Sequence, residues 1–247
     1  MNLLSAFSFG KIIKTFVPGL LATGGVLLVV ELLYRLSLST PCPSGSGFLG
    51  CFFGGSFLRR VALVDTARTT AFGAFLIPIG LMLGFLLNTF MWWRCNDWCR
   101  RRVECRIDAN LLAARQSIEA RASRAFRTVV GQTDAVPRTH LQDFYLPLLD
   151  LDKLTFLRES YFAWFEFHFN SLAAMVWTGL AYVVTVVWLA AHWTMPLNYG
   201  SHVLLPVAAL ILVSALVYVA GLNNLRRYQE GFIWFLIGTL HFRSVGP

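Results

Sequence analysis

The sequence predicts an all-α integral membrane protein with four membrane-spanning helices and a cytoplasmic helical hairpin formed by extensions of the second and third spans. Two observations carry this prediction. Hydrophobic residues make up 56% of the 247 residues and charged residues only 14%. In ordinary soluble domains charged residues make up about 25%. Apolar runs at residues 15–30, 69–93, 171–191 and 203–222 divide the chain, and crossing a bilayer takes about 20 residues of helix.

The N-terminal pair of spans, within residues 1–93, begins with the shortest of the four runs. This run reaches the required length only if it includes Glu31 and ends near Leu38, so we place the first span at 15–38 and the second at 69–93. Residues 1–10 contain no basic group, and no small-residue cleavage site follows the first run. We therefore expect the first helix to be a span and not a cleaved signal peptide.

A loop rich in glycine and phenylalanine joins the first two spans. Its stretch 45–57 carries no charge, which fits either a compact cap on the helix ends or a segment that dips into a protein-lined cavity. Cys42 and Cys51 in the same loop form a disulfide if this face of the membrane is oxidising.

The distribution of basic residues predicts the orientation. Of the 21 Lys and Arg residues, 17 lie in the N-terminal stretch, in residues 94–170 or in the tail, and only Arg35, Arg59, Arg60 and Arg68 lie on the other side. The positive-inside rule then places both termini and the middle segment in the cytoplasm, and we expect a multi-pass protein of a bacterial inner membrane. The net charge of +8 is a topology signal, so no nucleic-acid partner is expected.

The middle segment, 94–170, is predicted to form the cytoplasmic hairpin. Apolar and small residues recur from Val103 to Val129 at an average spacing that keeps them on one face of a nearly straight helix. This stripe either packs on the returning chain or forms an oligomer seam or docking face. Turn residues fill 132–150, and a second helix is expected to start at Asp150 or Asp152 and run into the third span.

The C-terminal pair of spans occupies residues 171–222. The remaining residues, 223–247, form a predicted cytoplasmic tail, in which the apolar stretch 231–242 is too short to span. We expect this stretch to be an interfacial helix or a docking segment. Pro18, Pro78 and Pro206 lie inside three of the apolar runs and are sites of potential kinks.

Charged and amide side chains inside the spans are candidates for function, because such groups are costly in lipid. Glu31 is the one acidic residue within a predicted span, and Arg35 follows it at the spacing of a helical ion pair. The two are interpreted as a pair near the outer interface, with a pore-lining or proton-relay role as the alternative. Asn88, in the second span, is expected to bond a neighbouring helix or a substrate.

A denser group of polar and aromatic residues precedes the third span: Arg158, Tyr161, Trp164, Glu166, His168 and Asn170. Aromatic rings of this kind suit the headgroup region of a bilayer, so structural anchoring is one interpretation. A site for a ligand, a lipid headgroup or a docked partner is the other. His168 and Glu166 supply too few ligands to indicate a metal site.

Gly80 and Gly84 form a G-x-x-x-G motif in the second span, with Gly73 near the same face. Small residues at this spacing allow helix backbones to approach closely, so the motif predicts tight packing and, less directly, a homo-oligomer.

The sequence lacks the nucleotide-binding, zinc-protease and serine-hydrolase motifs, so neither an enzyme nor a cofactor is expected. The predicted function is a non-enzymatic oligomeric membrane protein that forms or gates a transmembrane path, such as a channel or pore, or senses membrane state. Its hairpin would dock a soluble cytoplasmic protein, as in a membrane effector of bacterial stress or antiviral defence. Two alternatives remain: a small-molecule transporter or membrane enzyme acting through Glu31, Asn88 or residues 161–170, and a scaffold for a soluble partner.

Overall fold

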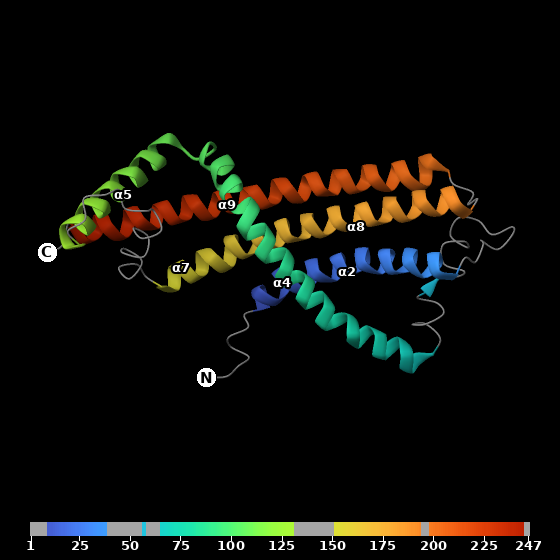
Figure 1. Ribbon diagram of the computed structural model, residues 1–247. Coiled ribbons are helices and arrows are strands. Elements are labelled where there is room, and N and C mark those ends of the chain that lie inside the picture. Colours follow the sequence, from blue (N-terminus) through green and yellow to red (C-terminus); the bar gives the residue numbers. More distant parts are fainter. Residues whose placement is uncertain (1–8, 39–55, 58–64, 131–150, 194–197, 245–247) are drawn as a thin grey trace. The chain divides into compact units, whose positions relative to one another are not determined.

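The computed structural model describes residues 9–38, 56–57, 65–130, 151–193 and 198–244 (Figure 1). In this part of the chain every regular element is a helix, so the predicted all-α class is confirmed there. The predicted disulfide between Cys42 and Cys51 and the predicted loop at 132–150 lie outside the described residues.

Four helices in the described residues are long and apolar enough to cross a membrane. They are α2 (Phe9–Leu38), α4 (Thr66–Glu104), α8 (Ala163–Trp193) and α9 (Leu205–Ser244). Large apolar side chains on their surfaces are exposed, as in α9, where Ile211, Leu212 and Leu216 are each 64% exposed. A protein in water rarely exposes so continuous an apolar face, so the four helices fit a multi-pass membrane protein.

The chain divides into two compact units, and the divisions fall inside α4, α8 and α9. Unit 1 comprises residues 1–95 and 166–221, and unit 2 comprises residues 96–165 and 222–247. The two units are described separately below.

In unit 1, contacts between residues far apart in the sequence give the directions of the helices. On α2 and α8, hydrogen bonds join Leu21 to Thr178 and Leu28 to Thr185, so these helices run parallel. On α8 and α9, by contrast, Phe169, early in α8, makes a tilted ring contact with Tyr218, late in the unit 1 part of α9, and Tyr182, later in α8, bonds to His202, just before α9. The C-terminal span is therefore antiparallel to α8, as expected for a chain that crosses back and forth.

The crossing of α2 and α4 depends on glycine. A Cβ atom added at Gly19 would overlap the backbone carbonyl of Gly80, and one added at Gly84 would overlap the carbonyl oxygen of Thr15. The G-x-x-x-G motif therefore packs tightly, as predicted, and its partner is a helix of the same chain. Gly73 has open space around it among the described residues and takes no part in this crossing.

Unit 2 contains the end of α4, helix α5 (Ala109–Val130), helix α7 (Leu151–Leu157), the π-helical turn η3 (Arg158–Phe162) and the end of α9. Leu236 of α9 is fully buried, and the side chains packed against it are Ile118, Ala122, Leu154, Phe232 and Phe235. Two residues of the predicted stripe, Ile118 and Ala122, thus pack against α9, as does Leu154 of the returning arm.

The prediction of one nearly straight outgoing helix from Val103 onward is wrong. Helix α4 ends at Glu104, and α5 begins at Ala109 after a turn. Asp108 starts the new helix, because its carboxylate accepts the N–H of Asn110 at 2.7 Å and its carbonyl accepts the N–H of Leu112 at 3.0 Å. A side chain that caps a helix in this way favours a new start over continuation.

The C-terminal apolar stretch is not a separate short helix. It is the last part of α9, which continues unbroken for 40 residues, or about 60 Å. Ile233 and Leu236 on this part are fully buried, whereas Trp234 is 61% exposed. The stretch contributes to the core of unit 2, and a docking or interfacial role applies only to its exposed side.

Candidate functional site

Unit 1 contains a cluster of four polar side chains from three helices, which we call the polar cluster: Lys14 of α2, Asn88 of α4, and Glu166 and Asn170 of α8. The ammonium of Lys14 forms an ion pair with Oε2 of Glu166, and their side chains are only 15% and 10% exposed. The amide of Asn170 lies 2.9 Å from Oδ1 of Asn88 and donates to it. Asn88 of α4 is thus bonded to a neighbouring helix, α8.

The same amide also bonds to a backbone carbonyl of α2 that has no donor within the helix. Pro18 lies inside this helix and has no N–H to donate to the carbonyl four residues earlier, which belongs to Lys14. Nδ2 of Asn170 donates to this carbonyl oxygen at 3.0 Å, and Asn170 is 1% exposed. A freed carbonyl in an apolar environment needs such a partner, and polar side chains of neighbouring helices commonly supply it.

A second proline likewise leaves a carbonyl that a side chain of α8 bonds. Pro206 of α9 cannot donate to the carbonyl of His202. This carbonyl accepts the phenolic hydroxyl of Tyr182 at 2.7 Å. His202 lies in η4 (Gly200–Leu204), a π-helical turn that precedes α9. Helix α8 therefore supplies donors to carbonyls that prolines free in both of its neighbours, α2 and α9.

Three further side chains of α8 donate to the backbone of α2. Trp177 donates to Ala22 at 3.1 Å, Thr178 to Leu21 at 2.7 Å and Thr185 to Leu28 at 3.4 Å. Contacts of this kind between parallel helices fix their register, because each donor reaches only one turn of the partner helix.

The C-terminal half of α2 carries a second buried ion pair. Glu31 and Arg35 pair at one-turn spacing and are 5% and 2% exposed. The other carboxylate oxygen of Glu31 accepts the backbone N–H of Phe57 at 2.7 Å. From Lys14 to Arg35 the helix rises about 30 Å, close to the thickness of a hydrocarbon layer. The buried charges of α2 therefore lie near the two ends of its span.

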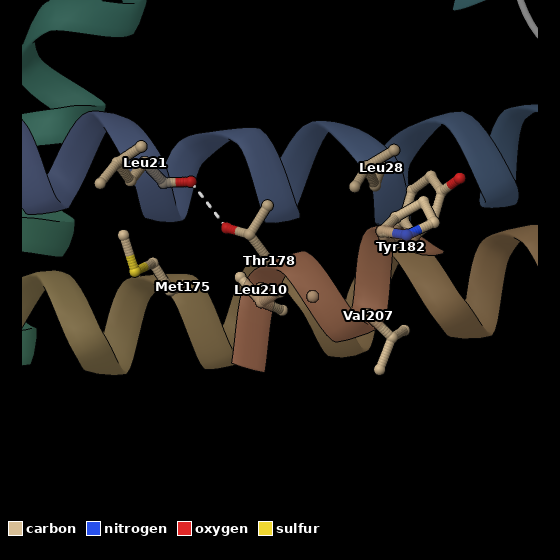
Figure 2. A pocket seen from close by; sticks show the side chains of 9 residues that line it. Leu21, Leu28, Met175, Thr178, Tyr182, Val207 and Leu210 are labelled. Atoms are coloured by element: carbon tan, nitrogen blue, oxygen red, sulfur yellow. Dashed lines mark hydrogen bonds between the residues drawn. The ribbon is translucent and has the colours of Figure 1, made fainter. Parts of the chain in front are cut away.

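An apolar cavity of about 320 Å³ lies between α2, α8 and α9 in unit 1 (Figure 2). In Figure 2, Leu21 and Leu28 approach it from α2, Met175, Thr178 and Tyr182 from α8, and Val207 and Leu210 from α9. The remaining lining residues are Gly179 and Pro206. The cavity thus adjoins the place where Tyr182 holds the carbonyl freed by Pro206.

The polar and aromatic group predicted at residues 158–170 is divided in the structure. Glu166 and Asn170 belong to the polar cluster, whereas Arg158 is exposed and Trp164 is 46% exposed. The ring of His168 meets that of Phe167 edge-on, with 5.5 Å between ring centroids, and Tyr161 is half-buried in η3. Arg158, Tyr161 and Trp164 belong to unit 2, whereas Glu166, His168 and Asn170 belong to unit 1.

Sequence reasoning missed the roles of Lys14, Tyr182 and the two prolines. The sequence did show a proline inside each of these apolar runs. A proline within a helix leaves the carbonyl four residues earlier without its N–H donor. The donors were not identifiable, since they lie 156 residues from Lys14 and 20 residues from His202.

Among the described residues, no group of three or more His, Cys, Asp and Glu side chains is arranged to hold a metal ion. Comparisons of the chain with protein-family models, with curated proteins and with solved structures find no match.

Proposed function

We propose that this chain is a non-enzymatic membrane protein that senses the state of the bilayer and relays it to a soluble protein docked on unit 2. Unit 1 is the membrane part, and unit 2 lies in the cytoplasm with both termini. The observation that carries the proposal is the set of hydrogen bonds from α8 to the proline-freed carbonyls of α2 and α9.

Proline-containing helices have fewer internal hydrogen bonds and bend more readily than regular ones. In unit 1 the carbonyls that the prolines of α2 and α9 leave without a donor are bonded by single side chains, Asn170 and Tyr182. A change in bilayer thickness or lateral packing alters the tilt that each span prefers. The free energy of that change acts on these two contacts, so α8 is the element that responds.

Helix continuity supplies the relay. The chain is helical without interruption from Leu151 through η3 to Trp193. The proposed relay runs along this helix from α8 to α7, whose Leu154 packs in the core of unit 2. The exposed surface of α5 is the proposed docking face for the soluble partner.

Sensing is favoured over conduction because the polar groups named above in the candidate spans are bonded within the chain. Lys14, Glu31, Arg35, Asn88, Glu166 and Asn170 all bond to other groups of the same chain. A water-filled path requires polar side chains that face the path. The exposed face of the α9 span is apolar instead, with Leu205, Ile211 and Leu216 between 64% and 67% exposed.

Hydrogen exchange in nanodiscs tests the proposal. The full chain is placed in nanodiscs of short-chain and of long-chain phosphatidylcholine, and amide exchange is followed in α5 and α7. We expect exchange in unit 2 to differ between the two lipids, and to lose this dependence in Asn170→Leu but not in Asn223→Leu, an exposed position on α9. Equal exchange in both lipids contradicts sensing, and a potassium flux in vesicles that requires the protein supports conduction instead.

A further inference from the structure

We propose that the cavity between α2, α8 and α9 binds one acyl chain of a bilayer phospholipid. This inference rests on the proposed function in one respect, namely that unit 1 lies in the membrane. The argument concerns what the cavity accepts, where the occupant comes from and what its presence does to α9.

Both hydroxyl protons in the lining are already donated within the protein. Of its nine residues, only Thr178 and Tyr182 have polar side chains. The hydroxyl of Thr178 donates to the carbonyl of Leu21 and that of Tyr182 to the carbonyl of His202, each at 2.7 Å. Figure 2 shows the bond of Thr178 running from α8 to the carbonyl of Leu21 on α2.

Water is a poor occupant of such a cavity. A volume of about 320 Å³ has room for roughly ten water molecules, each of which needs two to four polar partners. Walls of leucine, valine, methionine and proline do not provide them. An apolar molecule needs no such partners, and a cavity of this size and lining is typical of sites that bind apolar ligands.

The surroundings of the cavity indicate the source of the occupant. Next to the lining residues on α8 and α9, the apolar side chains of Leu180, Val184 and Ile211 are 60%, 57% and 64% exposed. In a membrane these side chains face lipid tails, so acyl chains surround the cavity and can enter it. A methylene group is close in volume to a water molecule, so a segment of roughly ten methylenes fills the space.

Occupancy acts on the proline position of α9. Pro206 and Tyr182 both line the cavity, and Leu210 lies so close to α8 that a Cβ at Gly179 would overlap its side chain. An acyl chain in the cavity supports α9 against α8 and keeps the hydroxyl of Tyr182 near His202. Without the chain, the walls lose dispersion contacts, which favours collapse of α9 onto α2 and α8.

Native mass spectrometry of the full chain released from detergent tests the site. Val207→Phe fills the cavity from α9, and Leu28→Phe fills it from α2. Val213→Phe is the matched control, because Val213 is on the same helix, is 43% exposed and does not line the cavity. We expect the wild type and Val213→Phe to retain one phospholipid per chain and both filling variants to lose it.

Thr178→Val provides a second chemical test, since it keeps the volume of the wall and removes a hydroxyl. We expect this variant to retain the phospholipid, because the occupant makes no hydrogen bond there. Circular dichroism shows whether each variant keeps its helix content. If Val207→Phe misfolds, the result for Leu28→Phe decides the test.

Retention of phospholipid by a folded filling variant overturns the proposal, as does a wild type that retains none. A retained free fatty acid in place of a phospholipid overturns the assigned source. Failure of the proposed function is distinguishable: in that case the lipid is retained and lost as described, but hydrogen exchange in unit 2 does not respond to the bilayer.

Discussion

The side-chain amide of Asn170 donates to the backbone carbonyl of Lys14, 3.0 Å away, and so supplies the hydrogen bond that Pro18 cannot make within α2. Because the same amide also reaches Asn88, one residue of α8 joins three helices of unit 1. This relationship leads to the first prediction.

Asn170→Leu should lower the free energy of unfolding by about 1–3 kcal/mol, because it leaves two partly buried acceptors, the carbonyl of Lys14 and Oδ1 of Asn88, without their partner. Pro18→Ala restores an N–H to the carbonyl of Lys14. In that background Asn170→Leu should cost less, with a coupling energy of about 0.5–1.5 kcal/mol. A double-mutant cycle by unfolding in mixed micelles measures both quantities. Equal costs in the two backgrounds would show that the amide does not compensate for Pro18.

Tyr182 and Pro206 should behave as a second, independent pair. Tyr182→Phe removes the donor to His202 and should cost about 0.5–1.5 kcal/mol, and Pro206→Ala should reduce this cost. Tyr199→Phe serves as the control, because Tyr199 is 63% exposed. The measurement is again unfolding in mixed micelles, and a control that loses as much stability as Tyr182→Phe would contradict the assignment.

The glycines of α4 should differ sharply in their tolerance of alanine. Gly84→Ala should destabilise the protein by about 1–3 kcal/mol or more, because its Cβ overlaps the carbonyl of Thr15 and the helices must separate. Gly73→Ala should be neutral or stabilise by up to about 1 kcal/mol, since its surroundings are open and alanine favours helix. Thermal unfolding of both variants in the same detergent tests this. Similar losses at the two positions would argue against the crossing of α2 and α4.

The ion pair between Lys14 and Glu166 should show charge complementarity. Glu166→Gln leaves a largely buried ammonium with a weaker partner and should cost about 1–3 kcal/mol. The exchange of both residues, Lys14→Glu with Glu166→Lys, should recover part of that loss. The exposed pair of Arg226 and Glu230 is the comparison, where Glu230→Gln should cost less than about 1 kcal/mol. Stability of the swapped variant below that of either single variant would contradict the pairing.

The sequence was sufficient where the signal is local. Apolar run length predicted the spans, one-turn spacing predicted the pair of Glu31 and Arg35, and the G-x-x-x-G motif predicted close packing. It failed where partners are distant or where a pattern continues across a break. The spacing of apolar residues continues through the turn before Asp108, so it did not indicate that α4 ends there. The polar residues from Asn223 to Glu230 interrupt the apolar pattern, so the sequence did not show that α9 continues. Asn170 and Lys14 are 156 residues apart, so no periodicity connects them.

Cysteine labelling of intact cells tests most directly the claim that unit 1 spans the membrane while unit 2 stays inside. In a background without the native cysteines, Ala120→Cys on α5 and Ser201→Cys in η4 place thiols at exposed positions of the two units. An impermeant maleimide should modify Ser201→Cys in intact cells and Ala120→Cys only after the membrane is opened. Modification of Ala120→Cys in sealed cells, or recovery of the chain from the soluble fraction, would contradict the account.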